Sequence, residues 1–226
     1  MSAHDLEPER RPIASRDRAT SKAVAHWLAT HGASPNAISL AGMIAGLGAG
    51  AALAATALFS SPVISRLCFA AAAVLIQLRL LANMFDGMVA IETGKMSPTG
   101  ALYNEVPDRV SDSAMFIGAG YGLGGQPPLG YLAACLAVFL AYLRAQGRVV
   151  GAPQEFCGPM AKPQRAFIMT LLSLYCALAP AAWQAELLMG GWGAAAWASS
   201  CAWASVTPGL TRPIMVMMFP QPRGGP

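Results

Sequence analysis

The segment NMFDGMVAIETGKMSPTGALYNEVPDRVSD, residues 83–112, decides the fold of this chain. It contains five of the seven acidic residues that follow position 22, and long apolar segments lie on both sides of it. Ionisable groups are unfavourable at membrane depth, so acidic residues that gather between apolar segments indicate a functional site. The composition of the whole chain tests whether these apolar segments belong to a membrane.

Composition indicates an integral membrane protein. Of the 226 residues, 55% are hydrophobic and 12% are charged, against roughly 25% charged residues in an ordinary soluble domain. Nine of the 26 charged residues fall in the first 22 positions. This balance excludes a disordered chain, a typical water-soluble enzyme and a basic domain that binds nucleic acid. We therefore expect membrane lipid, and no nucleic acid, as a partner.

Six apolar segments are long enough to cross a membrane, because a spanning helix needs about 20 mostly apolar residues. The predicted spans are residues 36–59, 64–91, 100–122, 128–144, 165–184 and 187–218. When Arg79 and Arg109 are set aside as lying within spans, twelve Lys and Arg residues lie toward one side of this arrangement, and Arg66 alone lies toward the other. By the positive-inside rule, both termini are expected to be cytoplasmic. We expect the membrane to be of the bacterial inner- or cell-membrane type.

The same pattern predicts the domain organisation of an all-α protein. We expect a disordered cytoplasmic tail over 1–19, an amphipathic interfacial helix over 20–33, a six-helix membrane domain over 34–219 and a cytoplasmic tail over 220–226. Ser34 and Pro35 would cap and begin the first span. A stripe of Gly42, Gly46 and Gly50 on that span allows close helix approach, either at a dimer interface or within the chain.

Helical spacing places the polar residues of the segment on two stripes. Each of two spans carries three of them: Arg79, Asn83 and Asp86 on the second, and Asn104, Asp108 and Asp112 on the third. Both stripes approach the loop 92–99, so they converge near the cytoplasmic interface. Three carboxylates and two amide oxygens suit Mg²⁺, Mn²⁺ or Ca²⁺ better than zinc. The alternative is a structural ion-pair network, since Arg109 can pair with Glu105 at i, i+4 and with Asp112 at i, i+3.

The segment also resembles the signature of the CDP-alcohol phosphatidyltransferase family. That signature reads DxxDGxxAR, then eight residues, then GxxxDxxxD, and residues 83–108 match its spacing without a gap. The expected residue types stand at Asp86, Gly87, Ala90 and Gly100, and again at Asp108. Six spans with both termini inside are also the architecture of that family, and homodimers are usual in it.

The resemblance implies a reaction. In that family, aspartates hold two divalent cations against the diphosphate of a CDP-linked donor, and the last aspartate is the base for the acceptor hydroxyl. For this chain it implies transfer of a phosphatidyl group from CDP-diacylglycerol to a polar alcohol, either plain or phosphorylated, with release of CMP. One or two Mg²⁺ or Mn²⁺ ions would be the cofactors.

The resemblance also implies roles for residues. The implied metal ligands are Asn83, Asp86, Asn104, Asp108 and Asp112, with Asp108 or Asp112 as the catalytic base. The implied donor-binding residues are Gly87, Ala90, Gly100, Arg79 and Arg109. The implied acceptor- or phosphate-binding residues are Arg144, Lys162 and Arg165.

The chain departs from the signature at three positions. Asn83 and Asn104 stand where the family has aspartate, and Ile91 stands where it has arginine. An amide oxygen still binds a hard cation, but two negative charges are lost. Arg79 or Arg109 could take the place of the missing arginine. Two other hypotheses therefore stay open: a catalytically degenerate member that binds lipid, nucleotide or a partner protein, and a transporter with an intramembrane acidic cluster.

Overall fold

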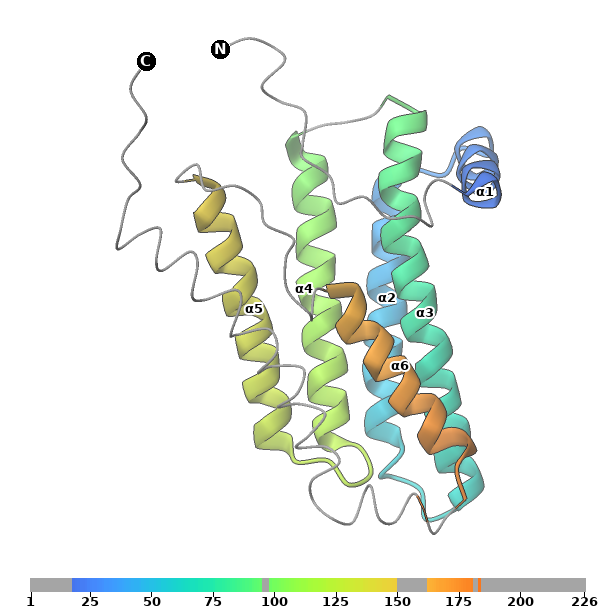
Figure 1. Ribbon diagram of the computed structural model, residues 1–226, viewed down its shortest axis with the longest axis vertical. Helices are drawn as coiled ribbons and strands as arrows, with labels where there is room; N and C mark the ends of the chain where they lie inside the picture. Colours follow the sequence, from blue (N-terminus) through green and yellow to red (C-terminus); the bar gives the residue numbers. More distant parts are fainter. Residues whose placement is uncertain (1–17, 95–97, 150–161, 181–182, 184–226) are drawn as a thin grey trace.

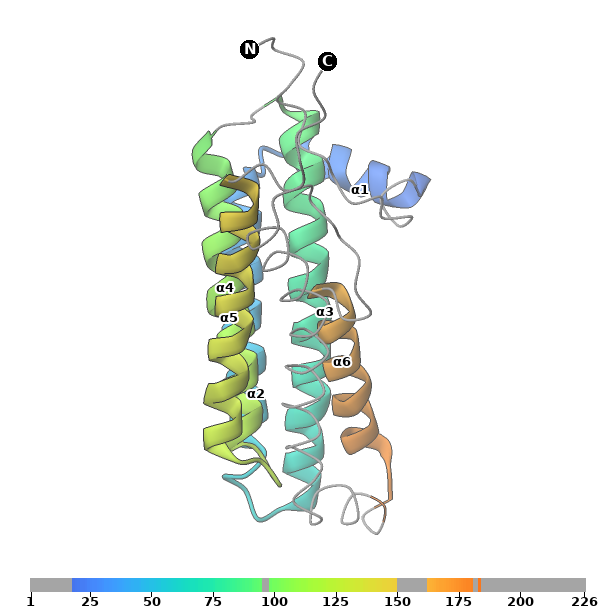
Figure 2. The ribbon, with the colours of Figure 1, turned by 60° about the vertical axis from the view of Figure 1, so that its left-hand side comes forward.

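The computed structural model describes residues 18–94, 98–149, 162–180 and 183, and no β-strand occurs among them. The described helices are α1 (Ala19–Thr30), α2 (Pro35–Ala55), α3 (Pro62–Glu92), α4 (Pro98–Tyr121), α5 (Pro127–Val149) and α6 (Lys162–Leu178). The long helices α2 to α5 run along the long axis of the molecule, and α6 packs beside α3 (Figure 1). Helix α1 lies across the bundle at the end where α3 finishes (Figure 2).

Prolines and glycines set the helix boundaries. Helix α2 begins at Pro35, and the hydroxyl of Ser34 accepts a hydrogen bond from the N–H of Ala37 at 3.2 Å, which confirms the predicted cap. Helices α3, α4 and α5 also begin at a proline. Gly32 after α1 and Gly94 after α3 have φ angles of 80° and 64°, which glycine adopts without strain.

The first four predicted spans correspond in order to α2, α3, α4 and α5. Helices α2 and α3 are long and apolar enough to cross a membrane. The apolar stretches of α5 and α6, Pro127–Leu143 and Arg165–Leu178, are shorter. The described part of the chain is thus an all-α protein with two clear apolar spans, and the six-span arrangement stays a prediction.

The fifth predicted span is longer than the helix that forms. It was expected over 165–184, but α6 ends at Leu178. Pro180 gives the physical reason, because proline cannot donate a helical hydrogen bond and disfavours helical backbone in the residue before it. The predicted sixth span, 187–218, and the C-terminal tail lie outside the described residues, as does nearly all of the N-terminal tail.

The glycine stripe of α2 packs inside the chain. A Cβ atom added at Gly42 would lie 2.9 Å from Cβ of Ala82 on α3, and one added at Gly46 would lie 2.5 Å from Cβ of Ser111 on α4. Gly50 is buried in the same way against the backbone of α4. Of the two interpretations, packing within the chain is therefore confirmed. The stripe holds α2 close to the two helices that carry the polar stripes.

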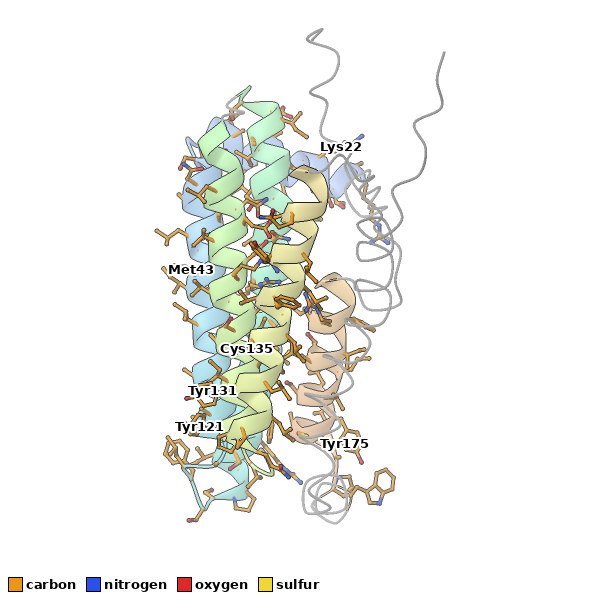
Figure 3. The ribbon with its side chains drawn as sticks, turned by 90° about the vertical axis from the view of Figure 1, so that its left-hand side faces the viewer. Lys22, Met43, Tyr121, Tyr131, Cys135 and Tyr175 are labelled. Carbon is orange, nitrogen blue, oxygen red and sulfur yellow. The ribbon has the colours of Figure 1, made fainter. Side chains whose placement is uncertain are left out.

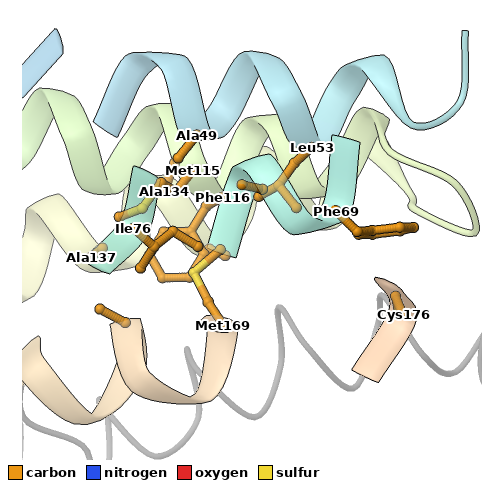
Figure 4. Packing of buried hydrophobic residues seen from close by; sticks show 13 residues of the cluster. Ala49, Leu53, Phe69, Ile76, Met115, Phe116, Ala134, Ala137, Met169 and Cys176 are labelled. Carbon is orange, nitrogen blue, oxygen red and sulfur yellow. The ribbon is translucent and has the colours of Figure 1, made fainter. Parts of the chain in front are cut away.

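The same helices enclose an apolar core, whose buried side chains are shown in Figure 4. Its larger members are Leu53, Phe69, Ile76, Met115, Phe116 and Met169, which pack around small residues such as Ala49 and Ala134. On α3 the core extends to Ile76, and the polar stripe begins at Arg79. On α4 the order is reversed, since Asp112 precedes Met115. The antiparallel helices therefore bring polar groups together at one level and apolar groups together at another.

The outer surface of the bundle is apolar. Ile44 on α2 and Leu67 on α3 are 62% and 63% exposed, and they belong to a larger set of exposed aliphatic and aromatic side chains. A surface of this kind is covered by lipid in a membrane protein. Helix α1 carries the exposed Trp27 and is tied to the end of α3 by His26, whose Nδ1 lies 2.8 Å from Oε1 of Glu92. Its location at the membrane interface stays a prediction.

Candidate functional site

One small cavity lies where α2, α3 and α4 meet. Its lining residues are Ser39, Gly42, Met43, Arg79, Asn83, Asp86, Asn104, Pro107, Asp108 and Ser111. Figure 3 shows the level of Met43 along the bundle, between Lys22 of α1 and the pair Tyr121 and Tyr131 at the opposite end. The two predicted stripes therefore meet, as the spacing of their residues indicated. About 10 Å³ is open to the centre of a water-sized sphere, which is room for about one water molecule or metal ion.

Asp86 is buried and held by two hydrogen bonds. Its Oδ2 accepts a hydrogen bond from the hydroxyl of Ser39 on α2 at 2.7 Å, and its Oδ1 accepts one from the N–H of Gly87 at 2.5 Å. Its relative exposure is 4%. Sequence reasoning missed Ser39. The signal was its place on the small-residue face of α2, three residues before Gly42 and seven before Gly46.

Arg79 connects the two polar stripes. Its guanidinium is almost wholly buried, with 1% of the side chain exposed. The Nη2 group donates to Oδ1 of Asp112 at 2.6 Å and to Oδ1 of Asp108 at 3.2 Å, and it also lies 3.5 Å from the carbonyl oxygen of Asp108. Its Nε and Nη1 groups are buried and have no hydrogen-bond partner among the described residues. Buried donors of a permanently charged group normally have an acceptor, so these two are candidate donors to a bound ligand.

Asp112 lies one helical turn beyond Asp108 and is surrounded by cations. Besides Arg79, its carboxylate lies 4.0 Å from Nη1 of Arg109 and 3.7 Å from Nη2 of Arg165 on α6. Arg109 also pairs with Glu105 at 2.9 Å, so both predicted ion pairs of α4 are confirmed. This network does not include Asp86, which belongs to a different helix. A structural ion-pair network thus explains only part of the acidic cluster.

The remaining implied site residues are placed as follows. Gly87 and Ala90 continue α3 beyond the cavity and are partly buried, and Gly100 lies in the first turn of α4. Ile91, which replaces the arginine of the signature, is 58% exposed. Arg144 and Lys162 belong to α5 and α6, but their side chains lie outside the described part of the structure.

The donor set suits a hard divalent cation. The carboxylates of Asp86 and Asp108 and the amides of Asn83 and Asn104 supply the oxygen ligands that Mg²⁺ and Mn²⁺ prefer. The described residues contain no group of three or more His, Cys, Asp or Glu side chains arranged around a metal position, so the amides would have to complete a coordination shell. With Arg79 the lining has one positive and two negative side chains, a net charge of −1.

No family model matches the chain. Over 152 residues, the chain is 34% identical to archaetidylinositol phosphate synthase of Aeropyrum pernix. The alignment covers 67% of this chain and 72% of the relative. It is 26% identical over 154 residues to the inner membrane protein YnbA of Escherichia coli, covering 68% of this chain and 73% of the relative.

Solved structures of phosphatidylinositol phosphate synthase (PgsA1) of Mycobacterium tuberculosis share the fold. The form with CDP-DAG bound has a TM-score of 0.59 and 21% identity, and covers 84% of this chain and 93% of the other. The form in complex with manganese and citrate has a TM-score of 0.60 and 21% identity, with coverage of 84% and 88%. Signature spacing, a shared helical fold and a relative with a third of its aligned residues identical agree: this chain is a membrane transferase that belongs to the CDP-alcohol phosphatidyltransferase family.

Proposed function

We propose that this chain transfers a phosphatidyl-type group from a CDP-linked lipid to the hydroxyl of a phosphorylated polyol, an inositol phosphate or a similar compound, and releases CMP. One observation carries the proposal: the buried side chains of Asp86 on α3 and Asp108 on α4 line one small cavity beside the guanidinium of Arg79. The names of the relatives support the substrate classes. One is a synthase of archaetidylinositol phosphate, and a phosphatidylinositol phosphate synthase was solved with CDP-DAG.

The depth of the cavity suits a lipid donor and a water-soluble acceptor. Helix α3 has 31 residues and is about 46 Å long, which exceeds the hydrocarbon thickness of about 30 Å. Asp86 lies six residues before its last residue, Glu92, a distance of about 9 Å along the helix. With cytoplasmic termini, the cavity lies just inside the cytoplasmic interface. The acyl chains of the donor stay in lipid there, while nucleotide and acceptor enter from water.

The proposed reaction is an in-line displacement at phosphorus. The acceptor hydroxyl gives its proton to the carboxylate of Asp108, and its oxygen forms a bond to the phosphorus that carries the lipid. The bond from that phosphorus to the oxygen bridging the diphosphate breaks, and its electron pair leaves with CMP. Arg79 holds Asp108 through the 3.2 Å contact, so the base is oriented before substrate arrives. Asp112 is the second candidate for the base, although the three guanidinium groups around it favour a positioning role.

A bound Mg²⁺ or Mn²⁺ would supply positive charge to the diphosphate and stabilise the charge that builds up on it in the transition state. Asp86 and Asp108 would hold the ion together with Asn83 and Asn104. The hydroxyl of Ser39 orients Asp86 by donating a hydrogen bond to its carboxylate. The manganese complex of the Mycobacterium tuberculosis protein supports this choice of cation.

The cationic groups beyond the cavity are suited to the phosphate of the acceptor. Arg109 and Arg165 converge on Asp112, which holds both side chains near the site. A phosphate could pair with either guanidinium, since arginine binds phosphate in a bidentate manner. We propose that Arg144 and Lys162 contribute to the same site. For the donor, Gly87, Ala90 and Gly100 would leave space for the nucleotide; homodimer formation stays a prediction.

The test measures CMP release by the purified full chain in lipid nanodiscs with CDP-diacylglycerol and Mg²⁺ or Mn²⁺. The proposal predicts release that depends on metal and on acceptor, is faster with an inositol phosphate than with unphosphorylated inositol, and is lost in Asp86→Asn. Glu92→Gln, six residues along the same helix and outside the cavity, is the matched control and should keep wild-type activity. Binding of CDP-diacylglycerol without CMP release from any acceptor would instead support the degenerate binding protein, which the two asparagines favour.

A further inference from the structure

Arg79 is the most unusual group in the cavity. A guanidinium stays charged at any physiological pH, and burying it in a membrane protein is unfavourable unless carboxylates compensate it. It is compensated here by Asp108 and Asp112, two residues on the facing helix. If the site were only structural, apolar side chains at these positions would avoid the unfavourable burial of charge. The retained arginine therefore points to a use for positive charge inside the cavity.

The charges of the side chains that line the cavity indicate what the positive charge of Arg79 does. The lining has two carboxylates, Asp86 and Asp108, one guanidinium and two amides at positions 83 and 104. Aspartates at 83 and 104, without the arginine, would give a lining charge of −4, which two divalent cations balance. The observed lining has a charge of −1, which one divalent cation already reverses to +1. Before the donor binds, a second divalent ion would lie in a positive site and next to a fixed guanidinium, where it is repelled.

The free donors of Arg79 show what the positive charge would bind. Two of the five N–H donors of a guanidinium are on Nη2, and these are used by Asp108 and Asp112. The three others, on Nε and Nη1, are buried without a partner among the described residues. Phosphate oxygens are the acceptors that best satisfy this planar arrangement of donors.

We propose that Arg79 acts as a fixed cation in place of one of two metal ions beside the diphosphate of the donor, so that the site takes one divalent ion. The proposal rests on the proposed function for the identity of the donor. It explains the two asparagines and the buried arginine together. Losing two carboxylates removes the ligands of one metal ion, and the guanidinium supplies the positive charge that this ion would have brought.

Metal stoichiometry tests this proposal without turnover. The purified full chain in nanodiscs with CDP-diacylglycerol is titrated with Mn²⁺, and free Mn²⁺ is followed by electron paramagnetic resonance. The wild type should bind one Mn²⁺ per chain. The triple variant Arg79→Met, Asn83→Asp, Asn104→Asp should bind two. Two ions in the wild type, or an unchanged count in a folded triple variant, would overturn the proposal.

A second variant covers the case in which the triple variant does not fold. Arg79→Lys keeps the charge but loses the planar donors, so it should still bind one Mn²⁺, while Arg79→Met should lower CMP release by about 100-fold or more. Two ions bound by Arg79→Lys would also overturn the inference. If the wild type releases CMP but binds two ions, the inference fails and the proposed function stands. If it releases no CMP from any acceptor, the proposed function fails, and the ion count still decides the role of Arg79.

Discussion

Gly46→Ala should disturb the site without changing any of its polar groups. The added Cβ would lie 2.5 Å from Cβ and 3.1 Å from Cα of Ser111, against about 3.5–4.0 Å for carbon atoms in contact. Ser111 is 1% exposed and touches Gly46 partly through its backbone, so it cannot turn away. Helices α2 and α4 must therefore separate by roughly 1 Å at this level to relieve the overlap.

The expected effect on activity is larger than the effect on stability. Overpacking costs about 1–3 kcal/mol, and alanine recovers about 1 kcal/mol of helix propensity, so the net destabilisation is about 0–2 kcal/mol. That corresponds to a fall in Tm of about 2–4 °C for each kcal/mol. The same displacement moves Ser39 relative to Asp86 and Asp108, and a shift of about 1 Å between reacting groups can lower kcat by about 100-fold.

The assay compares Tm in detergent and CMP release for Gly46→Ala and Gly48→Ala. The second variant is a matched control, because its Cβ would lie 3.4 Å from Cδ1 of Leu75, a distance that a flexible side chain accommodates. Gly48→Ala should keep wild-type kcat and show an equal or higher Tm. If Gly46→Ala retained the same Tm and kcat as Gly48→Ala, the close approach of α2 to α4 would not position the site, and the reasoning would be refuted.

Three further predictions concern the polar groups. Ser39→Ala removes the 2.7 Å hydrogen bond to Asp86 and should weaken Mn²⁺ binding by about 10-fold or more in an Mn²⁺ titration. An unchanged affinity would show that Asp86 does not need to be oriented by α2. Asp112→Asn leaves Arg79, Arg109 and Arg165 without their shared carboxylate. It should lower the free energy of unfolding by about 3 kcal/mol, which a fall in Tm would show. It should also raise the KM for a phosphorylated acceptor more than the KM for CDP-diacylglycerol. Chelation of divalent ions should abolish CMP release while Tm changes little, because Arg79 already compensates the carboxylates of α4; release that persists after chelation would exclude the proposed metal role.

Much of the site could be predicted because its residues repeat at helical spacing. Asn83 and Asp86 share a stripe with Arg79, and the polar positions of α4 recur every four residues, so each helix face is encoded locally. The short loop between α3 and α4 then forces the two faces to the same end of the bundle. The ion pairs of Arg109 were predictable for the same reason, since both partners lie on one helix.

Contacts between helices were not predictable in this way. The hydrogen bond from Ser39 to Asp86 and the contacts of Arg79 with Asp108 and Asp112 depend on how far each helix is rotated about its axis, and no local pattern sets that rotation. The rotation follows from the glycines of α2, which fix its closest approach to its neighbours. The sequence therefore predicted donor binding for Arg79 but not its burial between two carboxylates.

The central claim is that Asp108 is the base of a metal-dependent transfer from a CDP-linked lipid, and one measurement tests it most directly. CMP release from CDP-diacylglycerol, with Mn²⁺ and an inositol phosphate, is measured for the wild type and Asp108→Asn in nanodiscs, together with binding of the donor. The account predicts metal-dependent release by the wild type and a loss of at least about 100-fold in the variant, with donor binding retained. Release by Asp108→Asn at the wild-type rate would contradict it.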